Sequence, residues 1–252
     1  MNTGTCPVWL KFGPPDKTFG HIGVAIGSGA FSPYGHVGLI HREREQVRFL
    51  HLAWHFWLQE DELQSYAWVV TPLLAEHAML VAARCRSIAR KHSAGIPYAP
   101  KFLASRFDDE GELVLGKGEH GFTCATFILA VFEHAGLPLV SKESWPSRTD
   151  DQSFVQTIVK QLNSSLAHLR QKRVIYEQVL DLAKAELLRQ RETELARHIE
   201  NVDSEVIDAR FRPEEVAAAS SIDPCPASFE VVIRAAQQIV AQFECSSDVS
   251  PE

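Results

Sequence analysis

The chain has 252 residues, of which 45% are hydrophobic and 23% are charged, a composition typical of globular proteins and not of disordered ones. The formal charge of -7 comes from residues 201–252, which hold ten acidic and three basic residues, whereas residues 1–200 hold 22 of each. A dedicated nucleic-acid binder would carry a basic surface, so this balance argues against that class of function.

The first elements that the sequence predicts are three short β-strands with alternating or continuous apolar residues. They are residues 21–27, 36–41 and 46–55. The polar segment between the last two strands predicts the turn of a hairpin.

The register of this hairpin decides whether two histidines meet. If the turn has an even number of residues centred between Glu43 and Arg44, His36 lies directly opposite His51 on the same face. A turn with an odd number of residues would shift the register by one and separate them. Glu-Arg is not a preferred two-residue turn, so both registers stay open.

A further strand is predicted at residues 66–73, and the apolar periodicity of residues 74–92 is that of an amphipathic helix. We expect Gly95 to close this helix. Residues 96–121 predict a long loop, and loops of this length are commonly functional.

Residues 122–139 predict a short buried helix with Thr123 as its N-cap and Gly136 at its end. Cys124 then falls in the first turn. There the positive end of the helix dipole and the free amides favour the thiolate form of a cysteine.

From residue 151 to about residue 202 the pattern is helical throughout, as one long helix or a helical hairpin, and residues 228–243 predict a last helix. No catalytic cluster is visible in this half. Because the last glycine is Gly136 and no proline occurs in residues 147–212, we expect a mixed domain in residues 1–145 and a helical region in residues 146–252.

The sequence contains neither a run of ~18 apolar residues nor a signal-peptide pattern. We therefore expect a cytoplasmic protein without stable membrane insertion, with delivery by a secretion machine left open. An odd number of scattered cysteines favours reduced thiols, and no zinc-ligand spacing occurs, so we expect no metal and no other cofactor. The cysteines are Cys6, Cys85, Cys124, Cys225 and Cys245.

A cysteine nucleophile needs an imidazole base and a third polar group that orients the imidazole. Cys124, His36 and His51 are residues of the types that these three roles need. A cysteine in an apolar helix is also a common core residue, so the residue types alone do not establish a site.

Three segments resemble motifs of one enzyme superfamily. GHVGLIHREREQVRFLHLAWH (35–55) resembles the hairpin of NlpC-type cysteine peptidases, which belong to the papain-like superfamily, and FTCATFILAVFEHAG (122–136) resembles their nucleophile helix. GIPYAP (95–100) resembles their Gly-x-Pro-Tyr element. Histidine precedes cysteine here, as in the circularly permuted branch that includes YiiX-like proteins and relatives of lecithin retinol acyltransferase. The resemblance covers about residues 20–140.

The resemblance implies an α+β papain-like catalytic domain in residues 1–145 with a helical C-terminal extension. It makes Cys124 the nucleophile, His36 the general base and acid, and His51 the orienting residue. The amide of Cys124 would bind the oxyanion, and Tyr98 and Thr123 would line the pocket or assist there.

Other histidines compete for the role of base. FGHIGVAIG echoes YGHVGLIH, so His21 is an alternative to His36, and His55 lies within an aromatic cluster that suits either a core or a pocket. We expect His41 to point to the other face of its strand and Cys85 to be a core residue. We expect His120 to lie in a loop, and a position at the cleft stays open for it.

The function expected from this resemblance is hydrolysis of an amide, peptide or isopeptide bond through a thioester acyl-enzyme. Two alternatives stay open: a lipid acyltransferase or thioesterase of the same fold, and a catalytically silent interaction module. The C-terminal helices either pack on the catalytic domain, pair with a second copy, or bind a partner protein.

Overall fold

The computed structural model describes residues 10–15, 19–28, 35–63, 66–207, 209–223 and 225–247, so Cys6 lies outside the described residues. The strands are β1 Ile22–Gly27, β2 His36–Glu43, β3 Gln46–Trp54, β4 Trp57–Asp61, β5 Ala67–Val70, β6 Arg106–Phe107 and β7 Leu113–Val114. The helices are α1 Ala75–Lys91, α2 Cys124–His134, the 3₁₀ turn Lys142–Ser144, α3 Asp151–Gln178, α4 Leu182–Asp203, α5 Pro213–Ala219 and α6 Phe229–Ser247.

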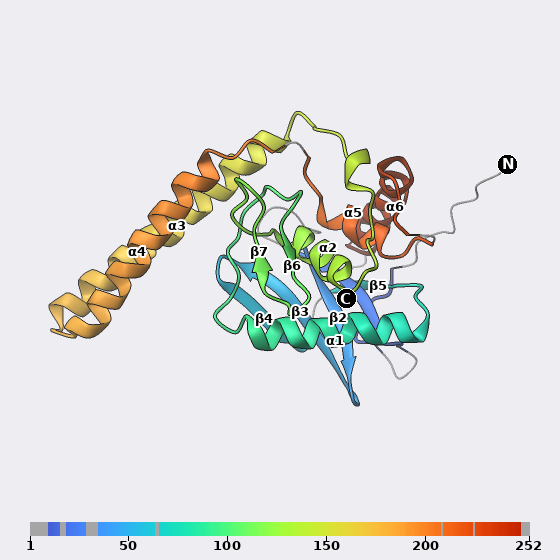
Figure 1. Ribbon diagram of the computed structural model, residues 1–252, viewed down its shortest axis with the longest axis horizontal. Helices are drawn as coiled ribbons and strands as arrows, with labels where there is room; N and C mark the ends of the chain where they lie inside the picture. Colours follow the sequence, from blue (N-terminus) through green and yellow to red (C-terminus); the bar gives the residue numbers. More distant parts are fainter. Residues whose placement is uncertain are drawn as a thin grey trace.

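The fold is mixed α+β, as expected. An antiparallel sheet of five strands in the order β4-β3-β2-β1-β5 forms its centre, and β6 and β7 form a separate small ribbon. Helices α1, α2 and α5 pack on one face, which carries Val24 and Leu39, while Phe19 and Trp68 cover part of the other face. Because both faces are covered, every residue of β1 is buried. The α3–α4 hairpin projects from this body (Figure 1).

The three predicted N-terminal strands are confirmed, but the register of the β2–β3 hairpin differs from both predicted ones. Glu43 pairs with Gln46 across a two-residue turn, Arg44–Glu45, in which Arg44 has a φ of 54°. The observed pairing is therefore shifted by two residues from the predicted even-turn register. Continued along the strands, it places Gly38, and not His36, opposite His51. A shift of two keeps every side chain on its predicted face, because side chains alternate with a period of two.

Sequence patterns missed several short elements. Strand β4 follows β3 through a tight turn in which Phe56 has a φ of 53°, and its sequence WLQED shows no strand alternation. The predicted loop of residues 96–121 contains β6 and β7. Helix α5 has only seven residues and begins at a proline, which is a favourable first helical residue but a weak signal alone.

Gly95 does not close α1, contrary to the prediction. The helix ends at Lys91, and its C-cap is His92, whose N–H donates to the carbonyl of Ile88. Gly95 has a φ of 90°, and a Cβ there would lie 2.2 Å from the carbonyl oxygen of Phe56. Its role is to let the chain pass the β3–β4 turn at close range.

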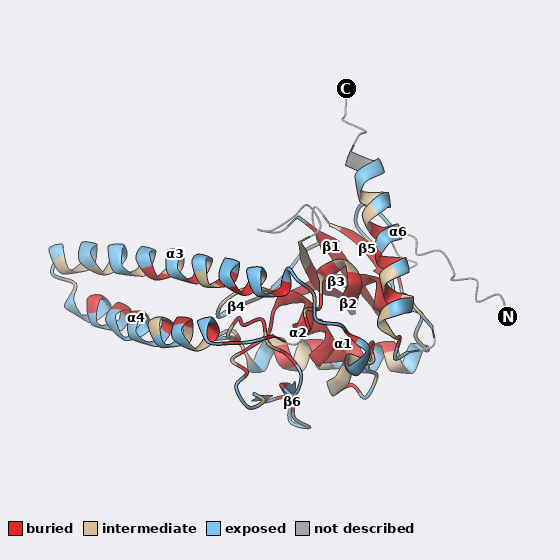
Figure 2. Cartoon of the chain, turned by 90° about the horizontal axis from the view of Figure 1, so that it is seen from above, coloured by how far each residue is buried: buried red, intermediate tan, exposed pale blue. Residues whose placement is uncertain are grey.

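The helical stretch after residue 150 forms a hairpin. Its turn contains Leu180, with a φ of 59°, and Asp181, whose carboxylate accepts the N–H of Lys184 at the start of α4. In α3 the buried residues lie between Asp151 and Leu166, near the base of the hairpin, whereas α4 has buried residues along its whole length, from Ala185 to Val202 (Figure 2). The two helices thus pack on each other, and the hairpin joins the body at its base.

The hydrophobic core crosses the predicted boundary between residues 145 and 146. Residues 216–219 of α5 are fully buried and belong to the same cluster as the sheet and α2, and Val232 and Ile239 of α6 extend that cluster. The C-terminal region therefore contributes to the core on which the sheet packs.

Gly95→Ala should destabilise the protein more than Gly136→Ala. Both glycines have positive φ, but a Cβ at Gly136 meets nothing within 4 Å. We expect Gly136→Ala to cost about 1–2 kcal/mol from the left-handed conformation, and Gly95→Ala about 3 kcal/mol or more because a backbone clash is added. Urea unfolding followed by circular dichroism measures both; equal losses would refute the role given to Gly95.

Candidate active site

Helix α2 starts with a complete capping box. The hydroxyl of Thr123 accepts the N–H of Thr126 at 3.2 Å, and the hydroxyl of Thr126 accepts the N–H of Thr123 at 2.8 Å. The predicted N-cap is therefore confirmed, and the Thr123 hydroxyl is occupied by the cap. Cys124 becomes the first residue of the helix, with its side chain beside the free amides of the first turn.

The Cys124 thiol is buried and held by several donors. The N–H of Val37 and the hydroxyl of Tyr98 donate to its sulfur, together with the amides of Ala125 and Cys124 itself. These donors lower the pKa of the thiol, but burial raises it by more, so the net direction is upward. The amides of the helix terminus thus favour the thiolate, as expected, but burial outweighs them and the thiol is the favoured form at neutral pH.

Tyr98 connects this thiol to the helical hairpin. Its ring lies against Trp54 at 4.7 Å between centroids, and its hydroxyl reaches Cys124. Its backbone N–H donates to Nδ1 of His55 at 3.2 Å, while its carbonyl accepts from Nε2 of His198, on α4, at 2.9 Å. Two histidines thus hold the backbone of the residue that contacts the thiol.

His36 and His51 meet through a hydrogen bond. Nε2 of His36 lies 2.7 Å from Nδ1 of His51, and Nε2 of His51 lies 3.4 Å from Oδ2 of Asp61, on β4. A carboxylate only accepts hydrogen bonds, so Asp61 favours the proton on Nε2 of His51. Nδ1 of His51 then accepts from His36, which leaves Nδ1 of His36 with its lone pair free.

Burial keeps both imidazoles neutral. It lowers the pKa of His36 to about 4, with the proximity of His51 as a second cause. Burial also lowers the pKa of His51, although Asp61 opposes this shift. At neutral pH the base candidate is therefore unprotonated, which is the form that accepts a proton.

The backbone at the start of β2 lies at the thiol. Gly35 lines the same pocket as Cys124, and the N–H of Val37 contacts the sulfur, so both neighbours of His36 lie at the thiol. Tyr66 lies 6.2 Å from the His36 ring, and its pKa is raised by burial, by Cys124 and by Asp61. Among the described residues no hydrogen bond joins His36 to Cys124 directly.

The competing residues lie elsewhere. The carbonyl of His21 accepts the N–H of Arg42, at the opposite end of β2 from His36. His55 accepts from the backbone of Tyr98 and contacts His198, so it is a structural neighbour of the site.

The positions expected for His41, Cys85 and His120 are confirmed. His41 is fully buried on the opposite face of β2 and bonds Glu60 at 3.0 Å. Cys85 is a core residue whose pKa is raised by burial, and His120 lies in the loop before α2.

The thiol opens onto a pocket of about 240 Å³ that combines both halves of the chain. From the second half come Arg210, Arg212, Asp150 and Glu214, none of which sequence reasoning selected. They lie far from Cys124 in sequence and follow no known motif, and the one local pattern among them is that Arg210 and Arg212 flank Phe211.

A second pocket of about 820 Å³ lies between the β3–β4 turn and the hairpin. Trp54, Phe56 and Trp57 line it from the sheet, and Leu169 and Leu195 line it from the helices. The ring of Trp54 also contacts Tyr98, and its indole N–H donates to Ser165 of α3 at 3.3 Å.

Comparisons with family models, with curated proteins and with solved structures give no match. Within the described ranges no group of three His, Cys, Asp or Glu side chains is arranged to hold a metal ion, and no helix is long and apolar enough to cross a membrane. The four described cysteines are free.

The protein should lose stability between pH 7 and pH 5, in part through His55. Burial and His198 lower its folded-state pKa to about 3, so at pH 5 the unfolded chain binds a proton that the folded chain does not. The stability contributed by neutral His55 is then fully present above about pH 6.5 and is lost as the pH decreases toward 3. His55→Gln should remove about 2 kcal/mol of the difference between pH 7 and pH 5.

Urea unfolding at both pH values measures this difference. His168→Gln, at an exposed histidine of α3, is the matched control and should keep the wild-type difference. A His55→Gln variant that also keeps it would contradict the buried neutral state of His55.

Proposed function

We propose that the protein is a cysteine hydrolase that forms a thioester acyl-enzyme on Cys124. His36 serves as general base and acid, and His51 and Asp61 orient it. The observation that carries this proposal is the chain from His36 through His51 to Asp61, which leaves one imidazole nitrogen of His36 free, while the next residue, Val37, contacts a thiol at a helix N-terminus through its N–H.

In the first step the sulfur of Cys124 attacks a carbonyl carbon while its proton moves to Nδ1 of His36. The carbonyl oxygen takes the electron pair and becomes an oxyanion. Collapse of this intermediate breaks the bond to the leaving nitrogen, which receives the proton from His36 and departs as an amine. A thioester remains on Cys124.

In the second step water attacks the thioester and gives a proton to His36. The carbon–sulfur bond then breaks, the acid product leaves, and the proton returns to the sulfur. The amide of Cys124 and the hydroxyl of Tyr98 are two of the donors at the sulfur, and we assign them to the oxyanion. Hydrogen bonds between catalytic groups are often long before substrate binds. We therefore expect His36 and Cys124 to come within hydrogen-bond distance when substrate is bound.

The fold supports this assignment at the coarse level. An antiparallel sheet with the two histidines on neighbouring strands, packed on a helix that begins at the cysteine, is the arrangement that the resemblance to the permuted NlpC-type branch implies. We propose membership of that branch on this ground. Four free cysteines also fit the reducing cytoplasm, which we propose as its compartment.

The second candidate function is transfer or hydrolysis of a lipid acyl group. The observation that favours it is the large aromatic pocket beside Trp54, which has room for an apolar chain. An acyl chain there would lie one side chain away from Tyr98, and the same thioester chemistry would apply.

The first prediction of this proposal concerns pH. Because neutral His36 accepts the proton, iodoacetamide labelling of Cys124 should change less than about twofold between pH 7 and pH 5.5, since the pKa of His36 is about 4. An unassisted thiol loses about tenfold in thiolate per pH unit. Labelling of the exposed Cys225 and Cys245 should therefore slow about 30-fold between pH 7 and pH 5.5. Labelling of Cys124 in His36→Ala should slow by the same factor.

Mass spectrometry of each labelled cysteine in one sample makes this comparison internal. Asp61→Asn should slow Cys124 about threefold to tenfold by loosening the tautomer of His51, whereas Glu62→Gln, at the exposed neighbour, should not. Labelling of Cys124 with the same pH dependence as Cys225 would remove the base assigned to it.

Substrate class needs a separate measurement. We expect wild-type protein to release products from at least one of three sets: peptides with peptidoglycan fragments, isopeptide-linked ubiquitin-like conjugates, and phospholipids. Cys124→Ser should abolish release and trap no thioester, which denaturing mass spectrometry reads directly. Activity that survives in Cys124→Ser would disprove the nucleophile, and wild-type inactivity with inert Cys124 would favour an interaction module.

A further inference from the structure

Arg210 lies in the wall of the Cys124 pocket and has few acceptors for its positive charge. Its guanidinium stacks on Phe154, another wall residue, at 3.7 Å from the ring centroid. The carboxylate nearest to it is that of Asp150, at 3.6 Å. Its Nε is buried and has no hydrogen-bond partner among the described residues.

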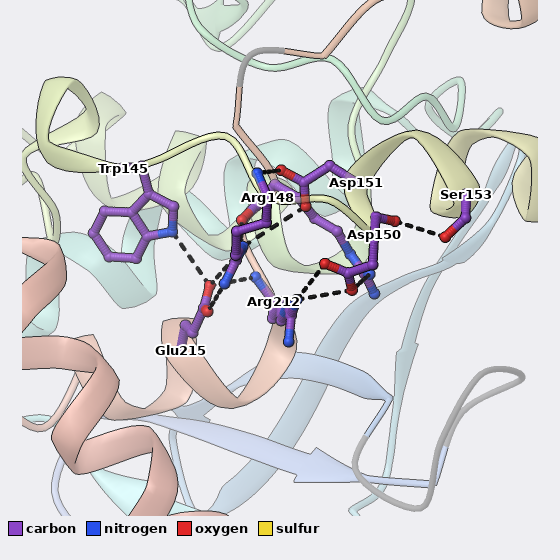
Figure 3. A network of polar contacts seen from close by, with 8 residues as sticks. Trp145, Arg148, Asp150, Asp151, Ser153, Arg212 and Glu215 are labelled. Carbon is purple, nitrogen blue, oxygen red and sulfur yellow. Dashed lines mark hydrogen bonds and ion pairs between the residues drawn. The ribbon is translucent and has the colours of Figure 1, made fainter.

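The two neighbouring arginines also have an Nε without a hydrogen-bond partner among the described residues, but their terminal nitrogens are paired much more closely with carboxylates. Arg212 makes a bidentate pair with Asp150, at 2.8 Å to each oxygen, and Arg148 is paired with the buried carboxylate of Glu215 (Figure 3). Asp150 is therefore already committed to Arg212 when it faces Arg210. A cation that is partly desolvated and shares one carboxylate with another cation is short of negative charge.

The electrostatics of the pocket agree with this shortage. Burial lowers the pKa of Arg210, and the nearby charge of Arg212 lowers it further. The other acid of the pocket, Glu214, has a pKa that burial raises, which disfavours its charged form. An incoming anion would relieve repulsion between the two guanidinium groups and supply the missing acceptors.

We propose that Arg210 binds a carboxylate of the substrate, next to the bond that Cys124 attacks. The inference rests on the proposed function and adds a substrate class: an acyl compound or peptide that carries a free carboxylate close to the scissile bond. A planar guanidinium stacked on Phe154 presents its N–H groups in one plane, which matches the two oxygens of a carboxylate.

The test uses two alkylating reagents of nearly equal size, iodoacetate and iodoacetamide. The ratio of their rates at Cys124 should exceed the ratio at exposed Cys225 and Cys245 in the same sample by at least about tenfold, because only the first reagent carries a carboxylate. His36 is neutral above about pH 5, so it does not supply this preference. Arg210→Gln should lower the ratio at Cys124 to that of the exposed cysteines, and Arg210→Lys should restore part of it.

Arg234→Gln, on α6 outside the pocket, is the matched control and should leave the ratio unchanged. An equal ratio at all cysteines in the wild type, or a high ratio that persists in Arg210→Gln, would overturn the proposal. Failure of the proposed function gives a different result: Cys124 then reacts slowly with both reagents, and His36→Ala does not change its rate.

A second measurement covers the case of an unreactive Cys124. Glutarate, a small dicarboxylate, should raise the melting temperature of Cys124→Ser, whereas uncharged glutaramide should not, because a ligand that binds the folded state stabilises it. The double variant Cys124→Ser with Arg210→Gln should lose the glutarate effect. No difference between the two compounds, or an effect that survives Arg210→Gln, would refute carboxylate binding, and inorganic phosphate as effective as glutarate would refute the preference for a planar anion.

Discussion

The buried ion pair between Glu215 and Arg148 is the interaction on which the site depends most. Glu215 is fully buried, and besides Arg148 it accepts the indole N–H of Trp145 and the backbone N–H of Arg212 (Figure 3). These partners come from the two chain segments that lead into the hairpin and out of it. Removing one member of such a pair leaves an uncompensated buried charge, which typically costs about 3–5 kcal/mol, so the return of the chain to the pocket is strongly enforced.

Because this ion pair joins the two segments, both halves of the chain contribute residues to the site. The chain leaves the body as α3 and returns as α4, and on its way back α4 brings His198 to the carbonyl of Tyr98. The segment after α4 then passes the thiol and places Arg210 beside it. The nucleophile and the histidines come from the first half, whereas the wall of the pocket comes from the second. An element that looks like an appendage in sequence therefore determines which groups surround the thiol.

What the sequence predicted well is what depends on local rules. Thr123 as a cap and Cys124 in the first turn follow from capping preferences, and the shared face of His36 and His51 follows from strand alternation, which survived a register error of two residues. Asp61 could not be found because β4 shows no alternation and its pairing depends on the turn at Phe56. Arg210 was equally hidden, since its position depends on a buried ion pair between residues 67 apart in sequence.

The electrostatics of the site define how its chemistry proceeds. Burial disfavours the charged form of both partners, raising the pKa of Cys124 and lowering that of His36. A resting ion pair of thiolate and imidazolium, the form that a helix N-terminus alone would suggest, is therefore the less stable state here. Charge must separate during attack on the carbonyl, when the sulfur gives its charge to the oxyanion and the imidazolium of His36 lies against His51, whose other nitrogen faces the carboxylate of Asp61. The chain of hydrogen bonds behind His36 is then needed most in the transition state, which is where an interaction accelerates a reaction.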